Sequence, residues 1–166
     1  MLDDLRDNLG DGHSQTVACS VNYAVLLLDD VASIRPEAAD KAWELLRLAR
    51  ATFRELNGDH HPMCSSAART SPSAEAALGK WEEARRTSHD AYELLKEVLG
   101  PTHPSTLTCA GNLAVVLSHL GRAEEARTKH HDTLAALSKR IGRDHPRVVA
   151  LQEWKLSCLD LEPHPI

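Results

Sequence analysis

A pattern that returns every 42 residues constrains this chain more than any other feature. Gly58-Asp59-His60-His61-Pro62 recurs as Gly100-Pro101-Thr102-His103-Pro104, and again as Gly142-Arg143-Asp144-His145-Pro146. A second pattern keeps step with the first, because Leu78-Gly79-Lys80-Trp81-Glu82-Glu83-Ala84-Arg85 recurs 42 residues later over Leu120–Arg127. A period of this length is typical of stacked repeats, in which each unit packs only against its neighbours.

An earlier copy of the pattern carries an insertion. Leu9-Gly10-Asp11-Gly12-His13 precedes the Gly58 copy by 48 residues, six more than the period. The extra residues fall near positions 29–36, and Ala42 is again in register with Ala84 and Ala126. Because loops project away from the packed faces, we expect the insertion to lie in the turn between the two helices of the first repeat.

Each repeat is predicted to be a helical hairpin. The proline of each His-Pro pair suits the first position of a helix, where a missing N–H costs nothing, and the histidine before it can cap that helix. In the third repeat Leu107, Ala110, Ala114 and Leu117 have the 3.6-residue spacing of one helix face, and Gly121 is expected to end that helix. The acidic first turn of the second helix faces the positive end of the helix dipole.

These apolar faces can be buried only if neighbouring hairpins stack. The prediction is therefore an all-α fold, a right-handed α-solenoid of about 3.5 helical hairpins, formed as a single array over residues 1–166. The expected repeats are about 9–57, 58–99 and 100–141, followed by a half-repeat over 142–161 and a tail over 162–166. Alanine at positions 42, 84 and 126 allows the close helix approach that such stacking needs.

Three places depart from a regular repeat. Pro72 falls inside the first helix of the second repeat, where it predicts a kink or break. Residues 1–9 have the pattern of the end of a second helix, which favours an origin in a longer array. At the other end a helix from Val148 to Asp160 is expected, followed by a short extended tail with two prolines.

Composition excludes several classes of partner. The net charge of -5 and the lack of a basic stripe give no support to nucleic-acid binding. No apolar run approaches the ~20 residues of a membrane span, and the acidic N-terminus lacks the features of a signal peptide. A cytoplasmic protein is therefore expected. The cysteines form no C-x-x-C pair and are expected to be small helix-packing residues: Cys19, Cys64, Cys109 and Cys158.

No motif of catalysis or cofactor binding is present in the sequence. It contains no phosphate-binding loop and no nucleophile in a recognisable setting, so we expect no enzyme activity, no catalytic residues and no cofactor. The histidines of the repeated turn are expected to cap helices: His13, His60, His61, His103 and His145. His89, His130 and His131 leave metal binding as a weak alternative, but zinc normally takes three or four ligands, so no metal site is predicted.

One stretch of the third repeat resembles a known family. The pattern Asn112-Leu113-Ala114-x-x-Leu117-x-x-x-Gly121-Arg122-x-x-Glu125-Ala126 is similar to the tetratricopeptide family, in particular its 42-residue type found in kinesin light chains. The resemblance covers about residues 9–160. The tail, with Leu107–Ala114 and His131–Leu134, also resembles the C-terminal region of tetratricopeptide proteins encoded with actinobacterial FxSxx-COOH peptide systems.

The resemblance implies that the chain binds a peptide or a partner protein, in bacterial signalling or regulation, on a concave face lined by the first helices. By position, that groove would include Asn22, Ser66, Arg69, Thr108, Asn112, Val115, His119, Glu153 and Ser157. The side-chain amides of Asn22 and Asn112 can each pair with a peptide backbone, or else bond to neighbouring helices. A homo-oligomerisation module, paired through the terminal helices, is the alternative function.

Overall fold

The chain is almost entirely helical where its structure is described. A computed structural model describes residues 2–28, 36–57 and 62–157, leaving aside the side chains of residues 53, 56, 57 and 62–66. These residues form eight helices and no strand: α1 Leu2–Leu9, α2 Ser14–Leu28, α3 Pro36–Asn57, α4 Pro62–Ala77, α5 Trp81–Leu99, α6 Pro104–His119, α7 Ala123–Ile141 and α8 Pro146–Gln152. The predicted all-α fold is confirmed.

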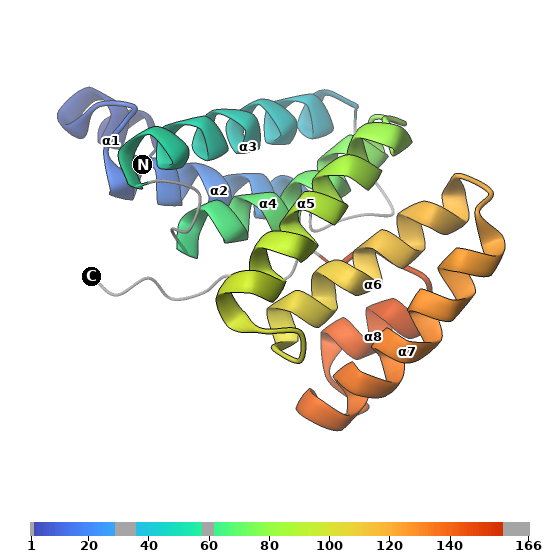
Figure 1. Cartoon of the computed structure of the whole chain (residues 1–166). Coiled ribbons are helices and arrows are strands. Elements are labelled where there is room, and N and C mark those ends of the chain that lie inside the picture. Colours follow the sequence, from blue (N-terminus) through green and yellow to red (C-terminus); the bar gives the residue numbers. More distant parts are fainter. Residues whose placement is uncertain (1, 29–35, 58–61, 158–166) are drawn as a thin grey trace.

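The helices form two layers of a solenoid. Each helix packs against the next one along the chain, and α2, α4, α6 and α8 also contact one another in that order. These four are the first helices of successive hairpins, and they make one layer. The second helices, α3, α5 and α7, form the other layer, so the hairpins stack side by side from the N-terminal to the C-terminal end (Figure 1).

The histidines of the repeated turn cap the first helices, as the sequence predicts. The His103 Nδ1 atom accepts a hydrogen bond from the Ser105 N–H at 3.2 Å, and His145 Nδ1 accepts one from the Arg147 N–H at 3.2 Å. His13 does the same for the Gln15 N–H at 3.3 Å. The capping role is therefore confirmed at these three histidines. His60 and His61 lie outside the described residues, as does most of the six-residue insertion.

The turns inside the α4–α5 and α6–α7 hairpins depend on glycine, at Gly79 and Gly121. α6 ends at His119, and Gly121 follows with a φ of 77°, a left-handed conformation that only glycine adopts without strain. The Gly121 N–H then donates to the Ser118 carbonyl oxygen at 3.1 Å, which satisfies one of the last carbonyls of the helix. The second helix begins two residues later, with Glu124 and Glu125 in its first turn.

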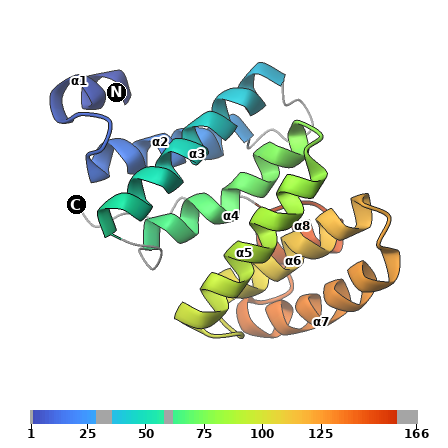
Figure 2. The ribbon, with the colours of Figure 1, turned by 45° about the horizontal axis from the view of Figure 1, so that its top comes forward.

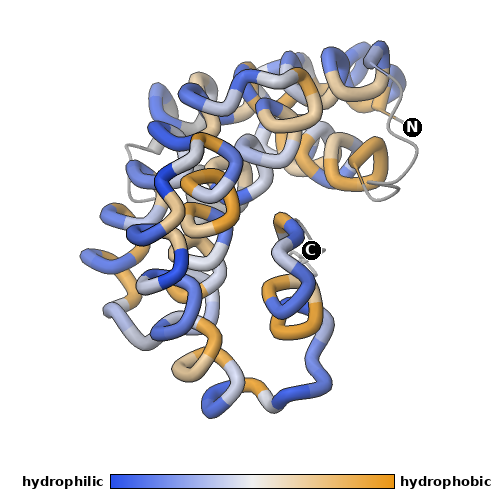
Figure 3. The backbone as a smooth tube through the Cα atoms, turned by 90° about the vertical axis from the view of Figure 1, so that its right-hand side faces the viewer, coloured by the Kyte–Doolittle hydropathy of each residue, from blue (hydrophilic) through white to orange (hydrophobic). Residues whose placement is uncertain are grey.

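The core runs along the array as a series of apolar clusters. Ala42, Ala84 and Ala126, at equivalent positions of the three hairpins, are at most 1% exposed. One cluster joins α2, α3 and α4, and others continue through α5, α6, α7 and α8. Hydrophobic and hydrophilic stretches alternate along much of the backbone (Figure 3), as expected of helices that bury one face.

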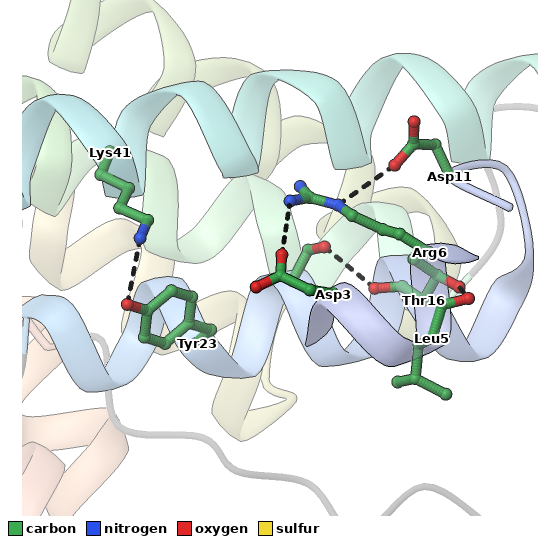
Figure 4. Close-up of polar contacts among 8 residues, drawn as sticks. Asp3, Leu5, Arg6, Asp11, Thr16, Tyr23 and Lys41 are labelled. Carbon is green, nitrogen blue, oxygen red and sulfur yellow. Dashed lines mark hydrogen bonds and ion pairs between the residues drawn. The ribbon is translucent and has the colours of Figure 1, made fainter. Parts of the chain in front are cut away.

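The N-terminal helix is attached to the array by few contacts. α1 has no buried residue, although Leu2 packs against the cluster formed by α2 and α3. The Thr16 hydroxyl donates to the Leu5 carbonyl oxygen at 3.4 Å, and the Arg6 Nε atom lies 3.1 Å from Asp11 Oδ1 (Figure 4). The same view shows the Lys41 ammonium of α3 donating to the Tyr23 hydroxyl of α2 at 3.2 Å.

Two local expectations fail, the break at Pro72 and the length of the last helix. α4 runs without a break through Pro72, because it is held between α3 and α5 and buries the residues on both sides of the proline. The last helix does not extend from Val148 to Asp160. It ends at Gln152, and Trp154 takes a φ of 55° that an α-helix does not allow. Residues 158–166, including the expected extended tail, lie outside the described residues.

Candidate functional site: a groove on the layer of first helices

A pocket of about 350 Å³ opens between α4, α6 and the segment that follows α8. Its residues come from the end of α4, the start of α5, the end of α6 and residues 154–156. The lining is mainly apolar: Ser73, Ala76, Ala77, Trp81, Val115, His119, Trp154, Lys155 and Leu156. The pocket therefore offers space for a side chain of a bound partner, with a lysine at its edge.

Asn112 of α6 binds the backbone of the segment after α8. Its Nδ2 atom donates to the Ser157 carbonyl oxygen at 3.0 Å, and the Ser157 N–H donates to its Oδ1 atom at 2.9 Å. The Asn112 side chain is 3% exposed. One amide thus satisfies both backbone groups of a single residue, and this geometry recognises an extended chain without depending on its side chain.

Two aromatic pairs hold the segment and the edge of the pocket. The rings of His130 in α7 and Trp154 are stacked with centroids 3.9 Å apart, and His130 Nε2 lies 2.7 Å from the Leu151 carbonyl oxygen. Trp81 at the start of α5 stacks on His119 of α6 with centroids 4.0 Å apart. The stacking on His130 fixes the position of Trp154. The chain then continues to Ser157, which bonds to Asn112 of α6.

The structure brings four of the sequence-predicted groove residues together. Val115 and His119 line the pocket, and Asn112 and Ser157 are bonded to each other beside it. The sequence left two uses open for the Asn112 amide, pairing with a peptide backbone or bonding to a neighbouring part of the chain. The structure shows a bond within the chain. For Asn22, half-buried in α2, no side-chain hydrogen bond is seen among the described residues.

The remaining predicted residues lie elsewhere. Arg69 is buried and donates to the Ser105 hydroxyl at 3.1 Å, while the Thr108 hydroxyl donates to the Pro104 carbonyl oxygen at 2.8 Å. Glu153 is exposed and lies 2.7 Å from the Lys155 ammonium. The side chain of Ser66 is outside the described part of the chain.

Sequence reasoning missed several residues of the pocket. Ala77 is in register with His119, 42 residues later, so the repeat itself would have placed both at the same edge. Trp154 and Leu156 had no such signal, because they were expected to lie within a continuing helix. Their place in the pocket depends on the stacking of Trp154 on His130, a contact between distant parts of the sequence.

The other candidate chemistry finds little support in the described residues. Among them, no group of three or more histidines, cysteines or acidic residues is placed to hold a metal ion. Burial raises the pKa of the Cys109 thiol to about 12, so the thiol stays protonated. A search of the described helices for one both long and apolar enough to cross a membrane finds none.

Layered hairpins and a groove over the first helices define an α-solenoid repeat protein. Residues 73–139 match the tetratricopeptide repeat family. The match extends from within α4 to near the end of α7. No curated protein matches the chain. Repeats of this family generally mediate protein–protein interaction, and they generally act as non-catalytic scaffolds.

Proposed function

We propose that this chain is a non-catalytic interaction module that holds an extended segment of a protein or peptide partner in the groove over α4 and α6. The narrower sequence resemblance to tetratricopeptide proteins of FxSxx-COOH systems supports a role in bacterial signalling or regulation. The proposal rests mainly on one observation, the mainly apolar pocket of about 350 Å³ between α4, α6 and residues 154–156. The Asn112 amide is bonded to the Ser157 backbone, so its part in this function is to hold the segment after α8 beside the pocket.

The lining of this pocket indicates what kind of segment it can bind. It lies within the groove, and its apolar lining suits a hydrophobic side chain of the bound segment. The lysine at its edge, Lys155, favours a partner with a carboxylate next to that side chain, although Glu153 competes for the same ammonium. The partner would then make backbone contacts along α6 and place one anchor side chain in the pocket.

Ala77→Lys tests this function without disturbing the core. Ala77 is exposed and lines the pocket, so a lysine side chain there would fill the space with a charged group. Ala135→Lys in α7 is the matched control, because Ala135 is an exposed helical alanine outside the pocket lining. Partners retained from the cells of origin by the wild-type chain should be retained by Ala135→Lys and lost with Ala77→Lys. Equal retention by both variants contradicts the groove assignment.

Self-association is the second candidate function. Leu9 at the end of α1 is 42% exposed and Leu26 of α2 is 60% exposed, so apolar surface remains at the N-terminal end of the array. Light scattering separates the two proposals. A mass that rises with concentration above the 18.2 kDa of one chain supports self-association, and a constant monomer mass contradicts it.

A further inference from the structure

A second cleft lies away from the groove, where α3 and α5 both pack on α4. It has a volume of about 340 Å³. α4 packs against both α3 and α5 (Figure 2). The lining of the cleft is unlike that of the groove because it is mostly charged or polar: Trp43, Arg47, Arg50, Ser71, Glu75, Glu83, Arg86 and Thr87. None of these residues lines the groove pocket or contributes to the proposed peptide site.

Three arginines line this cleft, Arg47, Arg50 and Arg86. Arg47 lies 2.9 Å from the carboxylate of Glu44, but both side chains are exposed and such a pair contributes little. No ion pair of Arg50 in α3 or Arg86 in α5 with a carboxylate is seen among the described residues, although the charge of Arg50 acts on Glu75 and that of Arg86 acts on Glu82. Lys80 adds a further positive charge, because its ammonium lies over the indole of Trp43, 3.9 Å from the ring centroid. The positive charge of these side chains therefore exceeds the negative charge of Glu83.

Glu75 reaches this cleft from the buried side. Glu75 is 6% exposed, its Oε1 atom accepts a hydrogen bond from the Thr87 hydroxyl at 3.0 Å, and its Oε2 atom has no hydrogen-bond partner among the described residues. Burial raises the pKa of this carboxyl from 4.5 to about 7, against the lowering effects of Thr87, Arg50 and Lys80; Glu83 adds to the rise. Near neutral pH a large fraction of Glu75 thus carries a proton, and its hydroxyl has no acceptor.

The fold itself does not require a carboxyl group at this position. In register, Glu75 corresponds to Leu117 of the next repeat and to Leu27 of the one before. Both of those leucines are at least partly buried in the core. A leucine would therefore satisfy the packing, whereas a buried acid with one unpartnered oxygen is destabilising unless something binds it.

We propose that this cleft binds an oxyanion, the phosphate or carboxylate group of a small ligand, between the guanidinium groups of Arg50 and Arg86 and a hydrogen bond donated by Glu75. Guanidinium groups match the geometry of both oxyanions and bind them through charge-assisted hydrogen bonds. The protonated carboxyl supplies a donor where a carboxylate would repel the ligand. The site does not depend on the peptide groove, so either can fail without the other.

Equilibrium dialysis with labelled sulfate on the full chain tests the proposal. Sulfate keeps its charge between pH 6 and pH 8.5, so a pH dependence of binding reports on the protein. Only chains with protonated Glu75 bind, so the affinity should fall about 30-fold across this range as Glu75 ionises. Binding of one sulfate per chain with this loss is the expected result. No saturable binding at pH 6, at constant ionic strength, overturns the proposal.

Three variants assign the binding to the cleft. Glu75→Gln keeps the donor at all pH values, so it should bind sulfate equally well at pH 6 and pH 8.5. Arg50→Gln and Arg86→Gln should each weaken binding at least 10-fold at pH 6. Arg127→Gln, an exposed arginine of α7, is the control and should change nothing. The same affinity in Arg86→Gln and Arg127→Gln, or a wild-type affinity independent of pH, contradicts the site.

Competition identifies the source of the oxyanion. Inorganic phosphate and acetate are added separately against labelled sulfate at pH 6. Stronger displacement by phosphate assigns the cleft to a phosphorylated ligand, and stronger displacement by acetate assigns it to a carboxylate. Failure of both to displace bound sulfate overturns the proposal, because a general oxyanion site must accept at least one of them.

Discussion

Glu75 is a buried acid whose ionisation should lower the stability of the chain. Its pKa is about 7 in the folded state and 4.5 in the unfolded state, because burial disfavours the charged form. Below pH 4.5 both states hold the proton. As the pH rises towards 7 the unfolded state loses the proton first, so the free energy of unfolding falls over this range. The buried carboxyl therefore costs stability at neutral and alkaline pH.

Glu75→Gln should remove that cost. We expect a gain of about 3 kcal/mol in the free energy of unfolding at pH 8.5, and almost no gain at pH 3.5, where the glutamate is neutral in both states. Urea denaturation at the two pH values measures the difference. Glu97→Gln, at an exposed position of α5, is the control and should show no such pH dependence. An equal effect of Glu75→Gln at both pH values contradicts the ionisation argument.

Asn112 should be far more important for folding than its counterpart in the first repeat. Asn112→Ala removes two hydrogen bonds and leaves the buried N–H and carbonyl of Ser157 without partners, so we expect a loss of about 3 kcal/mol. Asn22→Ala, at the equivalent position of α2, should cost less than about 0.5 kcal/mol, as usual for a side chain away from such networks. Similar denaturation midpoints for the two variants would show that the Asn112 bonds contribute nothing.

At the scale of single elements, Pro72 stabilises α4 less than a non-proline residue would. The proline has no N–H to donate to the Ala68 carbonyl, and it occupies an interior position of a 16-residue helix. Pro72→Ala should raise the free energy of unfolding by about 1–2 kcal/mol, after allowing for lost ring contacts in a buried site. Pro104→Ala at the first turn of α6 is the control, because proline is well tolerated there. A destabilised Pro72→Ala would mean that ring packing outweighs the hydrogen bond.

The elements also show what a sequence can and cannot predict. Local signals sufficed for the ends of helices, so the capping histidines at 103 and 145 and the turn at Gly121 follow from the repeat. The break expected at Pro72 does not occur, because tertiary packing on both sides of α4 overrides the local effect of the proline. The last helix was predicted too long because its end is set by Trp154 and His130, which are 24 residues apart.

The candidate sites were harder to predict than the fold, for the same reason. The register identified Asn112, Val115 and His119 as groove residues, but not the segment at residues 154–157 that crosses them. The cleft at Glu75 carried a visible signal, since a charged residue stands where the neighbouring repeats have leucine. Its meaning depends on side chains from three helices, and no single stretch of sequence contains that arrangement.

At the scale of the whole molecule, stability should vary along the array, because each hairpin is supported only by its neighbours. α6 buries 13 of its 16 residues and is in contact with α4, α5, α7 and α8. α1 buries none, and α2 is its only close backbone neighbour among the described helices. Regions with few buried contacts open at low free energy, whereas the best-packed helices open only on global unfolding. We therefore expect the slowest amide hydrogen exchange in α6 and nearly unprotected amides in α1.

Trp154→Ala makes this gradient testable within one chain. Trp154 packs against two apolar clusters around α6, α7 and α8, so its removal should speed exchange there by the equivalent of about 3 kcal/mol. Exchange in α2 and α3, which do not contact these helices, should change little if the array opens hairpin by hairpin. Hydrogen exchange followed by mass spectrometry, with low urea to reveal partial opening, measures both regions at once. Equal acceleration at the two ends would show that the hairpins unfold as one cooperative unit.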